Sequence, residues 1–223
     1  MIADWISWLP DLLRGLLSSV LVAVLAIVFG YPAGILLALA TDARHRALRW
    51  TTVAVVEVLR GLPALVLVYV LYFGLVTIEL RLSAVVALLV ALSLAGAGYS
   101  TEIFRAGFNS VPRQTLEAGV ALGLSGGQRL IHIVLPQALR VSTPPLVSLG
   151  IILFHASALG FAIGMSELLG RAYQIGSVTF NYLSVLGLAG VLYAAVSIAG
   201  SRYVNSRSQD HASIPTTPRV SQS

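Results

Sequence analysis

The 223-residue chain contains no cysteine and no lysine, and it has few charged residues of any kind. Without cysteine it has no disulfide, thiol nucleophile or cysteine-based metal site, although the compartment stays open. Without lysine it lacks the P-loop lysine of a Walker-type ATPase and cannot form a Schiff base with a substrate. These absences exclude several classes of enzyme before any motif is considered.

Charge is scarce because most of the sequence is apolar. Charged residues make up 10% of the chain, hydrophobic residues make up 57%, and the mean hydropathy is +0.88. Because about a quarter of the residues in a soluble domain are charged, we expect an integral membrane protein with lipid around it. The net charge of +5 comes from arginines between apolar runs, which indicates membrane topology and argues against a nucleic-acid partner.

The apolar runs predict an all-α integral membrane protein with five transmembrane helices. The expected spans are residues 12–40, 51–78, 82–104, 137–164 and 180–203. The first run is too long for the apolar core of a signal peptide and follows acidic residues, so we expect an uncleaved span. Glycine and proline predict a kink at residues 30–32, an interruption near 61–63 and a break at Pro144 and Pro145.

The remaining segments complete the expected domain organisation. Residues 1–204 form the transmembrane domain, and residues 205–223 are rich in Ser, Thr, Pro and Gln, which predicts a disordered cytoplasmic tail. Residues 165–179 predict an amphipathic connector in which Glu167 and Arg171 have the i,i+4 spacing of a helical ion pair. The four histidines are too scattered along the sequence to predict a metal site.

The arginines predict the orientation of the chain. Most lie in the first loop, beside the loop between spans three and four, or after span five: Arg44, Arg46, Arg49, Arg105, Arg113, Arg129, Arg140, Arg202, Arg207 and Arg219. The opposite side holds Arg14, Arg81 and Arg171. The positive-inside rule therefore predicts an outside N-terminus, a cytoplasmic C-terminus and a cytoplasmic loop at residues 107–136.

That loop is the longest polar stretch between the expected spans, and it predicts a short helix, a glycine turn and a second helix. Ser110 is placed to cap the first helix, and Gly123 to end it in the left-handed conformation. Residues 125–127, Ser-Gly-Gly, are typical of a loop. Ala118 and Gly119 are small, so a partner protein is able to approach this helix closely.

Two interpretations of this short helix follow from its composition. Leu116, Val120 and Leu122 give it an apolar side at near-helical spacing, which is compatible with docking to a cytosolic protein or with resting on lipid. Helices that rest on lipid usually carry several cations, whereas this helix has Arg113 alone. The composition therefore favours a docking helix.

The motif in this loop has the spacing of a known family. Glu117-Ala-Gly is followed by Gly123 and, nine residues further on, by Ile133-x-Leu135-Pro136, which resembles the EAA loop of ABC importer permeases, E-A-A-x3-G-x9-I-x-L-P. Other segments resemble the polar amino acid uptake branch of that family: Glu57-Val-Leu-Arg60-Gly-Leu-Pro63, Tyr72-Phe-Gly-Leu75, Tyr99-Ser-Thr-Glu102-Ile-Phe-Arg105-Ala-Gly107 and Leu135-Pro-Gln-Ala-Leu-Arg140. The resemblance extends over residues 12–203.

The resemblance implies a transport subunit of the inner (plasma) membrane that has no cofactor and no ATPase site of its own. A cytosolic ATPase subunit would bind ATP and Mg, a solute-binding protein would deliver a polar amino acid or similar small solute, and a second permease chain, identical or different, would complete the route. The residues implied for ATPase coupling are Glu117, Ala118, Gly119, Gly123 and Pro136. Gly119 departs from the family pattern, which has a second alanine there.

Two acid–arginine pairs lie near the expected inner ends of spans two and three: Glu57 with Arg60, and Glu102 with Arg105. A charge deep in the bilayer costs about 2.5–3.5 kcal/mol, so pairing or interfacial placement is required. The simpler interpretation is that each pair stabilises its own helix end. The alternative is that the pairs brace the coupling loop against the spans.

His155 is the only histidine deep in an expected span, within Leu153-Phe-His-Ala-Ser157-Ala-Leu159, which resembles a family segment of the K-D-T-S-L type but lacks its lysine and acid. His155 and Ser157 are candidates for lining the solute route. Alternatively, His155 is a buried residue bonded to a neighbouring carbonyl.

Other classes of membrane protein fit the sequence less well. A stand-alone channel or secondary transporter usually shows intramembrane acids or inverted repeats, and no repeat is evident here. A membrane scaffold would need neither interrupted spans nor a buried histidine.

Overall fold

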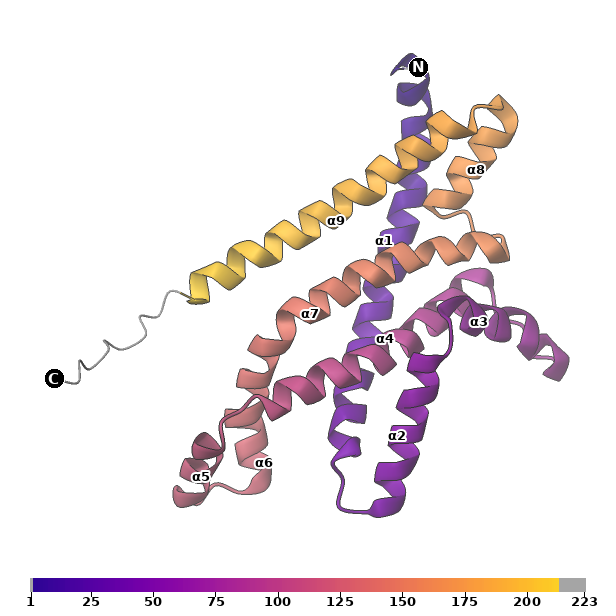
Figure 1. The fold of residues 1–223 in the computed structure, drawn as a ribbon. Coiled ribbons are helices and arrows are strands. Elements are labelled where there is room, and N and C mark those ends of the chain that lie inside the picture. Colours follow the sequence, from indigo (N-terminus) through magenta and orange to yellow (C-terminus); the bar gives the residue numbers. More distant parts are fainter. Residues whose placement is uncertain (1, 213–223) are drawn as a thin grey trace.

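The computed structural model describes residues 2–212, which are helical throughout apart from short connections and contain no strand. The elements in order are α1 (Ile2–Thr41), α2 (Arg46–Gly61), α3 (Ala64–Tyr69), η1 (Val70–Gly74), η2 (Leu75–Ile78), α4 (Ala84–Asn109), α5 (Arg113–Ala121), α6 (Gly126–Arg129), η3 (Leu130–Val134), α7 (Leu135–Ala156), η4 (Ser157–Ile163), α8 (Leu168–Thr179) and α9 (Tyr182–Ala212). Figure 1 shows α5 and α6 at the same end of the molecule as the α1–α2 connection, with the N-terminus and α8 at the other end.

Four described stretches are long and apolar enough to cross a membrane: Asp4–Thr41, Ala84–Asn109, Gly126–Ile163 and Tyr182–Arg202. Arg46–Gly61 and Ala64–Ile78 make a fifth when the two are counted as one broken span. The predicted interruption near residues 61–63 is present, and it is a bend of 100°. Pro63 explains the break, because proline disfavours a helical residue before it and Leu62 is extended.

The α4 helix is the centre of the bundle and packs most extensively on α1 and α7. Gly30 and Gly34, one turn apart on α1, allow this approach. A Cβ at Gly30 would lie 2.8 Å from the Ser93 carbonyl oxygen, and one at Gly34 would overlap the Ser100 hydroxyl. Small residues at this spacing let membrane helices meet at backbone distance. The predicted kink at residues 30–32 is not a break, since α1 remains helical through Pro32.

Two groups of buried side chains hold the bundle together. The larger group joins α1, α3, α4 and α7 with the segment after α7: Val22, Ala26, Leu67, Val68, Ala87, Leu88, Ala91, Leu92, Ala95, Leu149, Leu153, Ile163 and Met165. The smaller group joins the first part of α1 to α8 and α9: Leu12, Leu168, Ala172, Val185, Leu188 and Ala189. Because both groups include α1, this helix links the α4 core to the α8–α9 pair.

The predicted break at Pro144 and Pro145 is wrong, because α7 runs without interruption from Leu135 to Ala156. Both prolines are exposed, as are Arg140 and Val141, whose carbonyl groups lose their helical N–H partners. The disturbed side of the helix therefore faces away from the α4 core, and packing holds the helix together on the other side.

The predicted disordered tail, residues 205–223, stays a prediction. The α9 helix continues through Ala212, so residues 205–212 are helical, and residues 213–223 lie outside the described part of the chain. The predicted connector contains α8, but Glu167 does not pair with Arg171. Its carboxylate instead caps the first turn of α8.

Candidate functional site

The α5 helix presents the predicted coupling residues unequally. Glu117 and Ala118 are exposed, together with Val120 and Leu122, whose exposed fractions are 55% and 79%. Within the described chain Glu117 makes no ion pair, and the expected partner Arg113 is also exposed. A side of α5 thus combines one free carboxylate with apolar contact area.

Gly119 is buried and faces inward, so it does not belong to this exposed surface. A Cβ at this position would lie 2.8 Å from Ile133 Cδ1 and 3.2 Å from Arg129 Cγ. The missing side chain lets α5 rest against the returning helical segment. Gly119 was expected to let a partner protein approach α5, but its open side is occupied by Arg129 and Ile133 of this chain.

The predicted left-handed turn is present at Gly123, whose φ is +74°. The Leu124 N–H donates to the Gly119 carbonyl and the Gly123 N–H donates to the Val120 carbonyl, which is a Schellman motif. The predicted cap at Ser110 is wrong, because Ser110 ends α4 and Pro112 precedes α5.

The segment 125–127, expected to be a loop, begins a helix instead. Ser125 and Gln128 form a capping box, with the Ser125 hydroxyl accepting from the Gln128 N–H and the Gln128 side chain accepting from the Ser125 N–H. From Gly126 the helix continues to Ile163, with Pro136 in the first turn of α7. The segment that follows α5 and its turn is therefore continuous with a candidate membrane span.

The four charged residues predicted as two local pairs form one cluster between α2 and α4. We call Glu57, Arg60, Glu102 and Arg105 the charged cluster. Arg105 Nη1 donates to both Glu102 oxygens at 2.9 and 3.0 Å. Arg60 Nη1 lies 3.5 Å from Glu57 Oε1 and 3.8 Å from Glu102 Oε1, so it links the two helices.

His155 and Ser157 do not meet in one cavity. His155 is exposed, and its Nε2 lies 2.7 Å from the Ser197 hydroxyl on α9. Ser157 is fully buried, and its hydroxyl donates to the Phe154 carbonyl. The predicted role of both residues in lining the solute route stays a prediction.

A buried carboxylate was missed by sequence reasoning. Glu167 is 0% exposed and accepts hydrogen bonds from the Leu169 and Gly170 N–H groups, both at 2.8 Å. It also accepts from the Tyr193 hydroxyl at 2.9 Å and the Ser19 hydroxyl at 3.3 Å. We call this group the Glu167 joint, because it ties α8 to both α1 and α9.

In the Glu167 joint, the carboxylate accepts hydrogen bonds from donors on α1, α8 and α9. Burial raises the pKa of the Glu167 carboxyl above its ordinary value, and the hydrogen bonds oppose that shift because they favour the charged form. The signal available in the sequence was Ser19 within a long apolar run, since a polar residue in a span usually has a partner there. The partner itself lies 148 positions away and was not predictable.

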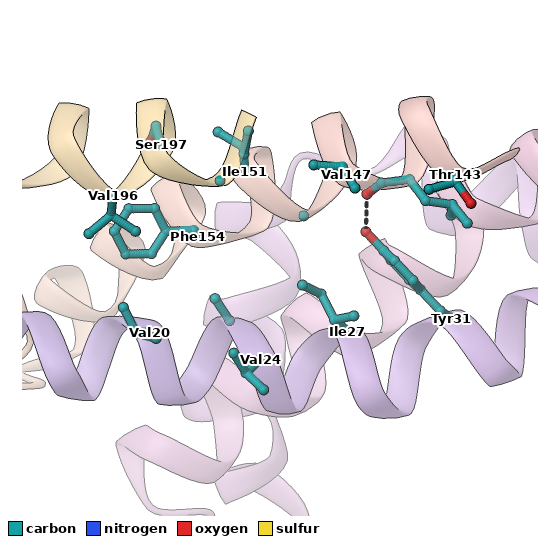
Figure 2. A pocket seen from close by; sticks show the side chains of 14 residues that line it. Val20, Val24, Ile27, Tyr31, Thr143, Val147, Ile151, Phe154, Val196 and Ser197 are labelled. Carbon is teal, nitrogen blue, oxygen red and sulfur yellow. Dashed lines mark hydrogen bonds between the residues drawn. The ribbon is translucent and has the colours of Figure 1, made fainter. Parts of the chain in front are cut away.

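A groove of about 410 Å³ lies between α1, α7 and α9 (Figure 2). Its wall is apolar, with side chains such as Val24, Ile27, Val147 and Phe154, and Figure 2 shows the Tyr31 hydroxyl turned to a backbone carbonyl. Among the described residues, no charged side chain lines the groove. It is therefore unsuited to a charged solute and suited to an apolar occupant.

Comparisons with known proteins agree with this architecture. A family profile described as "Binding-protein-dependent transport system inner membrane component" matches residues 30–207. YckA of Bacillus subtilis, a probable amino-acid ABC transporter permease protein, is 34% identical over 196 residues, covering 88% of this chain and 87% of YckA. ArtQ of the same organism, an arginine transport system permease protein, is 36% identical over 186 residues, covering 83% of this chain and 85% of ArtQ.

A solved structure has the same fold. One chain of the "Crystal structure of an amino acid ABC transporter with histidines" matches with a TM-score of 0.88 and 25% sequence identity, covering 94% of this chain and 98% of that chain. The match of the family profile to most of the chain, together with relatives above 30% identity over nearly their full length, shows the family. This chain belongs to the permeases of ABC importers, the membrane components of binding-protein-dependent transport systems.

Proposed function

We propose that this chain is the permease subunit of an ATP-driven importer that moves an amino acid across the inner membrane. The names of YckA and ArtQ support amino acids as the solute class. Residues 1–204 would make the membrane domain, paired with a second permease chain and served by an extracytoplasmic solute-binding protein. The chain itself would hold no nucleotide, since ATP and Mg would bind to the partner ATPase.

The observation that carries this proposal is the exposed side of α5. Glu117 is a free carboxylate beside Ala118, and the neighbouring apolar side chains are exposed as well. In an isolated water-facing helix these apolar side chains would gain from burial against a partner. We infer that this side docks into a cytosolic ATPase, with Gly119, Gly123 and Pro136 shaping the helix and its return.

The proposed orientation places α5 in the cytoplasm and the N-terminus outside. The α1–α2 connection carries Arg44, and the first turn of α2 carries Arg46 and Arg49. The connection lies at the same end of the molecule as α5 and α6 (Figure 1). Arginine-rich loops favour the cytoplasmic side. Closure of the ATPase pair would push α5, and the helix from Gly126 to Ile163 would carry that movement into the membrane.

The test is co-purification of the ATPase with the charge-reversal variant Glu117→Arg. We expect at least a tenfold loss of ATPase binding, roughly 1.4 kcal/mol, with ATP-driven uptake lost in proportion. The matched control is Asp42→Arg, an exposed acid at the same end of the molecule but outside α5. It should retain the ATPase.

Two results would contradict the proposal. Uptake that needs no ATPase subunit would identify a stand-alone transporter. Full ATPase binding by Glu117→Arg would mean that α5 is not the docking element. Thermal unfolding of both variants in detergent checks that neither result comes from a misfolded chain.

A further inference from the structure

The charged cluster lies within the membrane-spanning part of the chain and not beyond its ends. At 1.5 Å per residue, Glu102 is about 10 Å from the Asn109 end of α4 and about 27 Å from the Ala84 end. Arg60 is about 21 Å along α2 from Arg46, next to the 100° break of the second span. Four charges therefore lie inside two candidate spans and not in the loops that join them.

The cluster is also open on one side. The exposed fractions of the side chains are 34% for Arg60, 34% for Glu102, 37% for Arg105 and 66% for Glu57. Charged groups at this depth do not face acyl chains, because hydrocarbon offers them no partner. The open side must face water or another protein chain, which identifies the α2–α4 junction as an inward surface of the assembled transporter.

The hydrogen bonding within the cluster is uneven. Glu102 is held by two short bonds from Arg105, whereas the nearest acid oxygens to the Arg60 Nη1 are at 3.5 and 3.8 Å. The Nε atoms of Arg60 and Arg105 are both buried without a partner among the described residues, so the two arginines differ in their Nη1 contacts. The Tyr99 hydroxyl donates to the Arg60 backbone carbonyl and so fixes the end of α2. The bond from Tyr99 holds the Arg60 backbone in place, whereas the Arg60 guanidinium makes only long contacts to Glu57 and Glu102.

We propose that Arg60 and Glu57 bind the head group of the transported amino acid, with the carboxylate on Arg60 and the ammonium on Glu57. The inference rests on the proposed function, since it takes an amino acid as the solute. A guanidinium matches a carboxylate in a bidentate way, and the carbonyl end of α2 favours a cation beside Glu57. Glu102 and Arg105 are positioning residues that hold Arg60 from α4.

The charge balance fits this ligand. The cluster contains two acids and two arginines, and an amino acid head group is a zwitterion. Exchanging the long Arg60–Glu57 contact for one contact to each end of the zwitterion leaves no net charge inside the membrane. A broken span at this depth is also where transporters place polar ligands, because the helix ends there expose backbone groups.

The first test is a thiol-accessibility experiment that removes no charge. The chain contains no cysteine, so single-cysteine variants need no altered background. Gly61→Cys places a thiol beside Arg60, where an added Cβ meets nothing within 4 Å. Gly190→Cys on α9 is the matched control, since it has equal space and apolar neighbours. The assembled transporter in lipid vesicles is treated with a charged thiosulfonate, and labelling of the permease chain is measured.

We expect Gly61→Cys to react at least about tenfold faster than Gly190→Cys, because the reagent needs a thiolate in contact with water. Labelling should block uptake of radiolabelled L-amino acids and should slow when the solute is supplied during turnover. No labelling of Gly61→Cys in a transporter that still takes up its solute would overturn the proposal. That result would mean lipid or the second permease chain covers this surface.

The second test uses Arg60→Gln and Glu57→Gln in the same vesicles with the ATPase and the solute-binding protein. Removing a charged ligand contact should reduce uptake by at least roughly 30-fold, while the ATPase stays bound and hydrolyses ATP. Unchanged uptake overturns the inference, and so does loss of the second chain, which would make the cluster an assembly contact. Failure of the unmodified transporter to take up any amino acid would instead refute the proposed function.

Discussion

The Glu167 joint and the charged cluster are both acid-containing polar groups among apolar helices, but they are built in opposite ways. Glu167 is fully buried, and donors from α1, α8 and α9 occupy its oxygens at 2.8 to 3.3 Å. The charged cluster is one-third or more exposed, and Arg60 lies 3.5 Å or further from its acids. One group is closed, and the other remains open.

This difference separates a structural role from a binding role. A buried carboxylate with all its partners inside the chain has nothing left to offer a ligand, and removing it leaves those partners unpaired. An open cluster loses little internal bonding when one member changes, but it loses its capacity to hold a charged solute. Stability should therefore depend on Glu167, and transport should depend on Arg60.

The largest expected effect on stability comes from Glu167→Ala. The change leaves two backbone N–H groups and two hydroxyls without their acceptor, which should cost about 3–5 kcal/mol and lower the unfolding temperature by roughly 10 °C. Thermal unfolding of the purified chain in detergent measures this. Glu117→Ala is the matched control, since that acid is exposed and unpaired within the described chain. Equal unfolding temperatures for the two variants would show that the joint does not hold the helices together.

A smaller effect is expected from Tyr193→Phe, which deletes one donor to Glu167 and keeps the ring. Its hydroxyl lies 2.9 Å from Glu167 Oε2, and the carboxylate keeps its other donors. We expect a loss of about 1–1.5 kcal/mol. The double variant with Glu167→Ala tests the coupling. The two losses should not add, because Glu167→Ala already removes the bond that Tyr193→Phe deletes. If the stability losses of the two single variants add fully in the double variant, the Tyr193 hydroxyl and the Glu167 carboxylate do not interact.

Arg60→Gln should have a still smaller effect on stability despite changing a charge inside a span. Its contacts to Glu57 and Glu102 are long, and the side chains involved are one-third or more exposed, so their loss should cost below about 1 kcal/mol. Arg60→Gln should therefore lose uptake while it keeps its stability, whereas Glu167→Ala should lose stability. An unfolding temperature as low as that of Glu167→Ala would remove the distinction between the closed and the open group.

Features set by local chemistry were predictable from the sequence. The places of the four candidate spans, and of the bent pair that makes a fifth, follow from long apolar runs. The break near residues 61–63 follows from a glycine and a proline close together. The turn at Gly123 was predicted because only a residue without a side chain takes a positive φ at little cost. Glu117 was predicted to be available to a partner, and its side chain is exposed.

Features set by partners far apart in the sequence were not predictable. Glu167 looked like the first member of an ion pair with Arg171, yet two nearby N–H groups and two distant hydroxyls take its oxygens. The pairs on α2 and α4 looked independent until the fold brought Arg60 beside Glu102. Pro144 and Pro145 predicted a break, but the packing of α7 on α4 outweighs two lost hydrogen bonds on an exposed side.

His155→Ala should have the smallest effect on stability. It tests whether His155 is a structural group, like the Glu167 joint, or a solute-binding group, as proposed for the charged cluster. The imidazole Nε2 is 2.7 Å from the Ser197 hydroxyl, so its bonding already joins α7 to α9. Because the ring is exposed, we expect a stability loss below about 0.5 kcal/mol and no change in the KM for the solute. Ser197→Ala should behave in the same way if the bond is structural. A raised KM for His155→Ala with unchanged unfolding would instead place His155 on the solute route, because only a ligand contact alters solute affinity without weakening the fold.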